Sequence, residues 1–197
     1  MPARSSFTRD MFIDAAFKIV RNKGRDKLSA RSIARELNCS TMPIYSYLKS
    51  MEKLNEELGK RAIELLLTYQ TPSRTGNAFL DMGLGYVLFA KREKNLFRFL
   101  FDEGYRRGEK GKAGRTLKDF AFGNLVPKMK GGARLEGLDE RQLERILTKM
   151  WVFTHGLASL INNNAFGSDD EDYITEILKE TGLFIIQGEK QKDNLIK

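Results

Sequence analysis

The sequence predicts an all-α protein of about nine helices. Apolar side chains recur at three- and four-residue intervals through much of the 197-residue chain, which is the spacing of one helix face. No stretch alternates apolar and polar residues as a half-buried strand does. Glycine and proline fall mainly between the helical segments. These three observations together favour a helical fold.

The first three predicted helices are close together in the sequence. Their ranges are about 8–23, 29–37 and 40–49. Thr8 is a suitable N-cap of the first helix, and Gly24 follows its end. Ser40 is the expected N-cap of the third helix, and Pro43 lies in its first turn, where a missing N–H does no harm. The side chains expected to pack between the three helices are Phe7, Met11, Phe12, Ala15, Ala16, Ile19, Val20, Ile33, Ala34, Leu37, Ile44 and Leu48.

The remaining helices are predicted at about 50–69, 75–91, 95–103, 116–129, 139–163 and 168–188. Ser50 caps the first of these, and two pairs resemble capping boxes, Asp139 with Gln142 and Ser168 with Glu171. Residues 104–115 and 130–137 are predicted loops. Wide apolar stripes mark the last two helices, formed by Leu143, Ile146, Leu147, Met150, Leu157 and Ile161 on one and by Ile174, Ile177, Leu178, Phe184 and Ile185 on the other.

Positive charge is concentrated in the first quarter of the chain. Residues 1–53 hold 11 Lys/Arg against 5 Asp/Glu, whereas the other 144 residues hold 23 against 21. The asymmetry indicates a polyanionic partner for the N-terminal part and another task for the rest. The plainer alternative is a small domain that is basic without binding a polyanion.

Composition narrows the protein class further. The single cysteine, Cys39, excludes an internal disulfide framework and is better explained as a small apolar side chain than as a redox sensor. The N-terminus lacks the pattern of a signal peptide, and no apolar run is long enough to span a bilayer. A cytoplasmic location is therefore expected.

Residues 28–54, LSARSIARELNCSTMPIYSYLKSMEKL, have the layout of a helix-turn-helix. Two short helices flank a tight turn, and the second carries polar and aromatic side chains followed by lysines. In such motifs the front of the second helix reaches base edges and the flanks reach phosphates. Thr41, Met42 and Pro43 suit base contacts. Ser29, Arg31, Ser40, Tyr45, Tyr47, Lys49 and Lys53 complete the set of candidate DNA-binding residues.

Here the chain resembles the tetracycline-repressor (TetR) family of bacterial transcriptional regulators. The resemblance covers about residues 7–54 and recurs faintly at 151–160. Its residues are Phe12-Ile13-Asp14-Ala15-Ala16, Gly24, Ile33-Ala34, Ser40, Ile44 to Tyr47 and Leu54, followed by Trp151 with His155-Gly156-Leu157-Ala158. Two positions depart from the family: Met51 stands where a phosphate-binding lysine is usual, and Asn38 stands where glycine is common.

The resemblance implies a DNA-binding domain at 1–53 and an effector-binding and dimerisation domain at 54–197. It implies a homodimer that binds a palindromic operator and is released by a small, largely apolar effector, without a cofactor or metal. The expected effector contacts are Tyr86, Phe89, Phe97, Phe101, Phe120, Met150, Trp151, Thr154 and His155. The expected dimer contacts are Leu157, Leu160, Ile161, Ile174, Ile177, Leu178, Thr181, Phe184 and Ile185.

Several alternatives stay open on the sequence alone. The aromatic residues of the body can fill an ordinary core, and His155 can be a packed helix residue instead of an effector contact. A constitutive DNA-binding protein without an effector is a second reading of the whole chain. A small-molecule binding protein or enzyme is a third, although the sequence has no glycine-rich phosphate loop, metal-ligand spacing or nucleophile–base pair.

Overall fold

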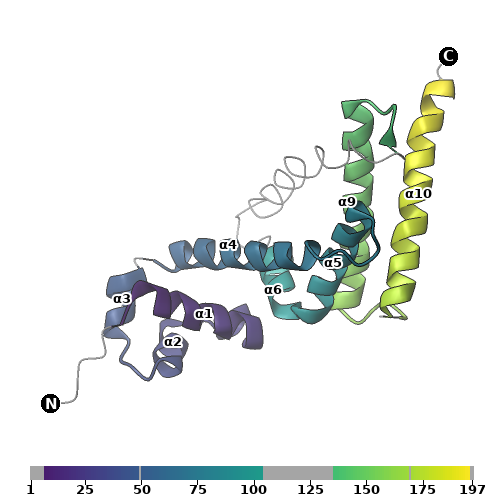
Figure 1. The fold of residues 1–197 in the computed structure, drawn as a ribbon. Coiled ribbons are helices and arrows are strands. Elements are labelled where there is room, and N and C mark those ends of the chain that lie inside the picture. Colours follow the sequence, from purple (N-terminus) through teal and green to yellow (C-terminus); the bar gives the residue numbers. More distant parts are fainter. Residues whose placement is uncertain (1–6, 49, 104–134, 169, 196–197) are drawn as a thin grey trace. The chain divides into compact units, whose positions relative to one another are not determined.

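The computed structural model describes residues 7–48, 50–103, 135–168 and 170–195, and these residues confirm the all-α prediction (Figure 1). They form eight α-helices, a 3₁₀ turn and a π-helical turn. The α-helices are α1 (Arg9–Lys23), α2 (Ala30–Glu36), α3 (Met42–Leu48), α4 (Met51–Gln70), α5 (Ala78–Arg92), α6 (Lys94–Arg98), α9 (Glu140–Asn162) and α10 (Glu171–Leu195). The predicted helix at 116–129 and the predicted loop at 104–115 lie outside the described residues, as does most of the predicted loop at 130–137.

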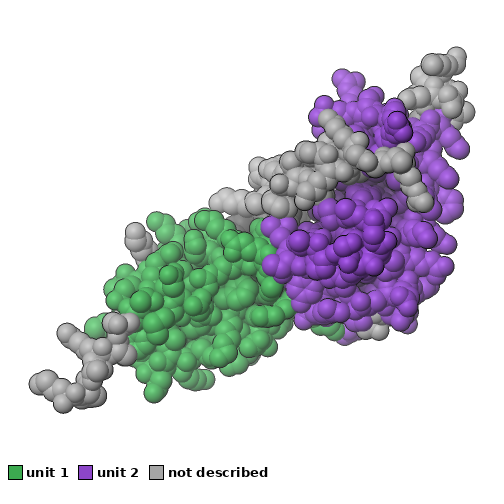
Figure 2. Space-filling model, in the orientation of Figure 1, with its two compact units in different colours: residues 1–65, 93–110 green, residues 66–92, 111–197 purple. Residues whose placement is uncertain are grey.

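The chain divides into two compact units, coloured separately in Figure 2. Unit 1 comprises Met1–Leu65 and Glu93–Lys110, and unit 2 comprises Leu66–Arg92 and Gly111–Lys197. The boundary between the units therefore lies within α4 and does not coincide with the predicted functional boundary at residue 53. Unit 1 contains α1 to α3, most of α4 and α6, whereas unit 2 contains α5, α9 and α10.

Helix α1 packs against α2, α3 and α6 in unit 1. The Thr8 Oγ1 atom accepts a hydrogen bond from the Met11 N–H at 3.3 Å, and Gly24 ends the helix with φ 84°, as the sequence predicts for both ends. Its buried face consists of Phe12, Ile13, Ala15, Ala16, Ile19 and Val20. Met11 was expected on this face but is exposed, because the buried face is centred on the ridge that contains Phe12 and Ala16.

The turn between α2 and α3 is held by backbone hydrogen bonds. The Cys39 N–H donates to the Ala34 carbonyl at 2.9 Å, and the Asn38 N–H donates to the Arg35 carbonyl at 3.3 Å. This is the Schellman arrangement, which requires a left-handed residue after the helix. Asn38 supplies it with φ 51°, a conformation that asparagine tolerates better than most residues.

Helix α3 begins later than the sequence predicts. Its first residue is Met42, so Thr41 and not the expected cap Ser40 immediately precedes it. The hydrogen bond from the Ile44 N–H to the Thr41 carbonyl at 3.2 Å belongs to this first turn. Ile44 and Leu48 are buried and fix the inner face of α3. Side chains on the opposite face are therefore directed to solvent.

Helix α4 starts at the predicted cap. The Ser50 Oγ atom accepts a hydrogen bond from the Lys53 N–H at 3.1 Å. Leu54, Leu58 and Ala62 are buried as expected, but the next buried residue is Leu66 and not Leu65. The observed spacing of four residues from Leu54 onward keeps these side chains on one side of the helix.

Helix α5 begins at Ala78, three residues after the predicted start, because Asn77 is its cap. The Asn77 Oδ1 atom accepts hydrogen bonds from the Phe79 and Leu80 N–H groups, both at 3.1 Å. Thr75 instead donates its backbone N–H and its hydroxyl to Asp81 Oδ1, at 2.8 and 2.7 Å. These bonds lower the pKa of the buried Asp81 carboxyl, although burial alone would raise it.

Gly85 marks a very close approach within unit 2. A Cβ atom at this position would lie only 2.2 Å from the Tyr69 carbonyl oxygen, near the end of α4. At Gly83, two residues earlier on α5, a Cβ atom would meet Leu178 Cδ1 at an ordinary 3.8 Å. The absent side chain of Gly85 therefore lets the backbones of α5 and α4 touch.

Helix α6 is joined to α1 inside unit 1. Arg21 donates from Nε to Glu93 Oε2 at 2.8 Å and pairs with the other oxygen of the same carboxylate through Nη2. The Asn95 side chain donates to the Arg21 carbonyl at 2.9 Å. Beyond α6, Phe99–Glu103 form a π-helical turn, so the predicted helix at 95–103 changes its hydrogen-bond pattern partway.

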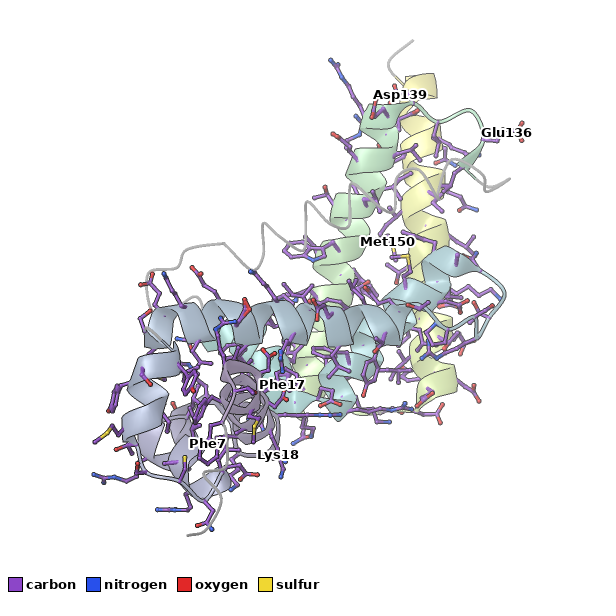
Figure 3. The ribbon with its side chains drawn as sticks, turned by 60° about the vertical axis from the view of Figure 1, so that its left-hand side comes forward. Phe7, Phe17, Lys18, Glu136, Asp139 and Met150 are labelled. Atoms are coloured by element: carbon purple, nitrogen blue, oxygen red, sulfur yellow. The ribbon has the colours of Figure 1, made fainter. Side chains whose placement is uncertain are left out.

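Helices α9 and α10 lie side by side and run antiparallel (Figures 1 and 3). Asp139 and Gln142 form the predicted capping box, with both hydrogen bonds at 2.7 Å. Leu143, Ile146, Leu147 and Met150 form a buried cluster, and a Cβ atom at Gly182 would lie 3.7 Å from Met150 Cε. The start of α10 was predicted wrongly: Asp170, not Ser168, accepts the bond from the Tyr173 N–H at 2.9 Å, and α10 begins at Glu171.

Candidate nucleic-acid interface

The outer face of α3 carries apolar and aromatic side chains in water. Met42 is 81% exposed and Tyr45 is 72% exposed, and the two are separated by three residues on one helix face. Tyr47 is 40% exposed, and its ring stacks on Phe12 of α1 with centroids 5.3 Å apart. The phenol of Tyr47 is thus held in place by the core while part of it remains accessible.

The other candidate DNA-binding residues are also at the surface. Arg31 on α2, Lys53 on α4, and Ser40 and Thr41 before α3 are all exposed. Lys49 lies outside the described residues, and so does the side chain of Pro43. Every described candidate is therefore accessible, which a helix-turn-helix requires of its binding face.

Ser29 has a structural role that the sequence reading did not assign to it. Its Oγ atom accepts a hydrogen bond from the Ser32 N–H at 3.1 Å, and its own N–H donates to Ser32 Oγ at 2.9 Å. The two serines form a capping box at the start of α2. The signal was present, because serine at the third helical position can take the place of the usual Glu or Gln.

Two of the five acidic side chains in residues 1–53 form ion pairs. Glu36 pairs with Lys18 at 2.6 Å, and Asp14 pairs with Arg61 of α4. The Lys18 ammonium, through its hydrogen bond and its charge, lowers the pKa of the Glu36 carboxyl. The Glu36 carboxylate consequently stays ionised near neutral pH.

The expected effector residues are divided between the two units. Phe97 and Phe101 belong to unit 1, where their ring centroids are 4.8 Å apart, whereas the remaining described members belong to unit 2. Phe89 and Phe97 are buried in their respective cores, and Phe101 is half-buried. Phe120 lies outside the described residues.

Three residues of unit 2 do come together. The Tyr86 hydroxyl and His155 Nδ1 are 2.9 Å apart, and the His155 ring stacks on Trp151 with centroids separated by 5.6 Å. Tyr86 is buried, which raises the pKa of its hydroxyl, while Trp151 is partly exposed. Met150 and Thr154, on the same helix as His155, are buried. This arrangement connects the surface of α9 with the interior of unit 2.

The expected dimer contacts separate into two groups. Leu157, Ile161, Ile174 and Leu178 are buried within the chain itself and form part of its own core. Leu160 and Phe184 are exposed, Phe184 by 73%, and Ile177, Thr181 and Ile185 are half-buried. Val152 and Tyr173 are exposed apolar residues that the sequence reading missed, because they lie off the main apolar stripes of α9 and α10.

The exposed large apolar side chains are confined to two places. Among the described residues there are ten, and five of them lie on or beside the helix-turn-helix while five lie on α9 and α10. The first five are Met11, Met42, Tyr45, Tyr47 and Met51, and the second five are Trp151, Val152, Leu160, Tyr173 and Phe184.

Within the described ranges, no group of three or more His, Cys, Asp or Glu side chains is placed to hold a metal ion. None of the helices in these ranges is both long and apolar enough to cross a membrane.

No protein-family model matches the sequence, and no curated protein is significantly similar to it. Solved structures do match. A TetR-like transcriptional regulator from Rhodococcus sp. RHA1 aligns over 89% of this chain and 93% of its own, with a TM-score of 0.61 and 15% identity. A protein assigned to the TetR family from Rhodococcus sp. aligns over 90% of this chain and 98% of its own, with a TM-score of 0.63 and 13% identity. This chain therefore has the fold of TetR-like transcriptional regulators.

Proposed function

We propose that the protein is a ligand-responsive, DNA-binding transcriptional regulator. In the proposed mechanism it is a homodimeric repressor that binds a palindromic operator and is released by a small, largely apolar effector. The proposal rests on the helix-turn-helix of unit 1, on the basic first quarter of the chain and on the fold it shares with TetR-like regulators.

The observation that carries the proposal is the two-sided character of α3. Ile44 and Leu48 anchor its inner face, while Met42, Tyr45 and Tyr47 are presented outward. A seven-residue helix has little stability of its own, so its position depends on this anchoring and on the Asn38 turn. A rigidly held helix with an accessible face is what insertion into a major groove requires.

The proposed dimer surface consists of the expected dimer residues that remain accessible on α9 and α10, namely Leu160, Ile177, Thr181, Phe184 and Ile185. Pairing these helices with their symmetry mates would form a four-helix bundle and cover the exposed Leu160 and Phe184. The two helix-turn-helix motifs of one dimer would then bind successive major grooves on one face of the duplex, about 34 Å apart.

The proposed effector site involves the Tyr86–His155–Trp151 group. Its aromatic rings suit a planar or apolar molecule, and its hydrogen-bonded pair gives polar recognition. Helix α4 contains residues of both units. In the proposed mechanism, the effector favours another position of the unit 2 end of α4, and this changes the separation of the two helix-turn-helix motifs in the dimer. DNA is released because the effector binds one of the two motif separations more tightly than the other.

A constitutive DNA-binding protein is the second candidate, and one observation favours it. Tyr86, Phe89 and Met150 are buried among other side chains, as in a filled protein core. In that case DNA binding would not respond to any planar aromatic compound.

The experiment is a binding titration of the full-length protein against duplexes selected from fragmented genomic DNA, with random duplexes of equal length as the control. A regulator is expected to prefer its selected site by roughly a thousandfold or more, with affinity that falls steeply as salt rises. Equal affinity for selected and random duplexes would contradict specific recognition. A panel of planar apolar compounds, added to the bound complex, then distinguishes an effector-responsive regulator from a constitutive one.

A further inference from the structure

Met42 is the most exposed large apolar side chain among the described residues, and it stands at the first position of α3. A methionine side chain makes no favourable interaction with water, whereas its flexible thioether packs well against an apolar partner. Tyr45 covers the same face one turn later. The front of the helix proposed to enter the DNA groove is therefore apolar.

No charged residue occurs on this helix. Met42–Leu48 reads MPIYSYL, and the preceding residues 37–41 are LNCST. Lys49 follows the last residue of α3 and lies outside the described residues. Among the described residues, the exposed cations Arg31 and Arg35 lie on α2, and the exposed Lys53 lies on α4. Positive charge that can bind phosphates thus lies before and after α3 in the sequence and not within it.

The four bases differ in the side chains that read them. Guanine is read by Arg or Lys, adenine by Asn or Gln, and cytosine by Asp or Glu, whereas thymine is read through apolar contact with its C5 methyl group. Helix α3 contains none of the first three kinds of side chain. Its hydroxyl groups can bond to several bases and discriminate little. Only the thymine methyl has a matching side chain at the front of α3.

We propose that Met42 is a specificity-determining residue that packs against the C5 methyl group of a thymine in the operator. The inference rests on the proposed function, because it requires α3 to lie in the major groove. It goes further in assigning the dominant direct base contact of this helix to an apolar group. The selected sites should accordingly contain a thymine at a fixed position in each half-site.

The test uses the full-length protein and the best selected duplex, in which each thymine is replaced singly by deoxyuridine. This replacement removes only the C5 methyl and leaves base pairing unchanged. Burial of one methyl group corresponds to about a fourfold change in affinity. At one thymine in each half-site, the wild type should therefore lose about fourfold in affinity.

The same scan on Met42→Ala should show no loss at that thymine, because the partner of the methyl group is gone. Met42→Leu should retain the loss, because leucine is also apolar and of similar size. Met11→Ala serves as the matched control, since Met11 is an exposed methionine of the same unit on α1, and it should behave as the wild type. Because Met42 is exposed, unfolding temperatures of all variants are expected to stay close together.

Two results would overturn the inference. If Met42→Ala keeps the full sensitivity to deoxyuridine at every position, Met42 does not read a methyl group, while specific DNA binding and the proposed function still stand. If the wild type shows no preference for any selected duplex, the proposed function itself fails and the inference falls with it.

Discussion

The two regions that expose large apolar side chains differ in the charge around them. Residues 1–53, which include α1 to α3, hold 11 Lys/Arg against 5 Asp/Glu. Helices α9 and α10 together hold 6 Lys/Arg against 8 Asp/Glu. A cationic surround attracts a polyanion, whereas a slightly acidic one repels it. The sign of the surrounding charge thus agrees with the two proposed partners, DNA for α3 and a second copy of the chain for α9 and α10.

The largest expected effect concerns the protein-binding half of this comparison. Phe184→Glu would place an unpaired carboxylate on the proposed dimer surface of both copies. Because burial of an unpaired charge costs several kcal/mol, self-association should weaken by roughly a thousandfold or more. Sedimentation at micromolar concentration would measure it. Lys179→Gln makes the same change in net charge at an exposed position on another face of α10 and should leave the dimer intact. A wild type that sediments as a monomer would contradict the proposed dimer surface on α9 and α10.

The second prediction concerns the ion pairs that hold α10 against α9. Glu189 is buried and accepts hydrogen bonds from Lys149 and from Arg145 Nε, the latter at 2.7 Å. The Lys149 hydrogen bond, with help from Arg145, lowers the pKa of Glu189 to about 2. Glu189→Gln should therefore destabilise the protein by roughly 1–3 kcal/mol at neutral pH, less than for a fully buried pair because both cations are partly exposed.

The pH dependence of that loss has a definite sign. Since the pKa of folded Glu189 is below the ordinary glutamate value of 4.5, the stabilisation is fully present above about pH 5 and is lost as pH falls toward 2. The difference in unfolding temperature between wild type and Glu189→Gln should shrink over this range. Glu176→Gln, an exposed change on the same helix, should show almost no difference at any pH. A difference that stays constant from pH 7 to pH 3 would mean that the ion pairs do not stabilise the fold.

The third prediction separates phosphate contacts from base contacts within the DNA-binding half. Tyr47→Phe keeps the ring that stacks on Phe12 and removes only the hydroxyl. Loss of one hydrogen bond to a charged phosphate should weaken binding to selected and random DNA equally, by roughly tenfold or more. Thr41→Ala should instead narrow the gap between selected and random DNA. Anisotropy titrations against both duplexes distinguish the two, and a change in base preference caused by Tyr47→Phe would reverse the assignment.

The smallest expected effect concerns an added positive charge at Met51. Met51 is the first residue of α4 and is partly exposed, where TetR-family sequences usually have lysine. Met51→Lys should tighten operator binding and steepen the slope of log affinity against log salt by about 0.9. The new cation lies at the positive end of the helix dipole and should cost about 0.3–1 kcal/mol of stability. An unchanged slope in a salt series would show that Met51 does not lie at the phosphate backbone.

Features that depend on neighbouring residues were predictable from the sequence. The caps at Thr8, Ser50 and Asp139 and the left-handed Asn38 follow from local hydrogen bonding and backbone preference. The helix-turn-helix was predictable for the same reason, because its turn and its two short helices are encoded within a few residues. The exposed candidates on α3 follow from the helical period once Ile44 and Leu48 are assigned to the core.

Features that depend on competition or on distant contacts were not predictable. Ser168 and Asp170 are both suitable cap residues by type, and it is Asp170 that accepts the hydrogen bond from the Tyr173 N–H. Thr75 looks like a cap, but its groups bind Asp81 one turn into α5, which leaves Asn77 as the cap. The expected effector residues share a composition and not a location, so the sequence could not show that Phe97 and Tyr86 belong to different units.

The contact at Gly85 sets unequal limits on how this protein can evolve. Alanine at Gly83 finds ordinary space beside Leu178 and should gain up to about 1 kcal/mol from its higher helix propensity. At Gly85 even the smallest side chain collides with the Tyr69 carbonyl, so any replacement forces α5 away from the end of α4. Tyr86 comes next in the chain and would be displaced from His155 by the same movement. Two glycines that look equivalent in sequence therefore differ in mutational tolerance, and descendants of this protein should vary at position 83 while keeping glycine at position 85.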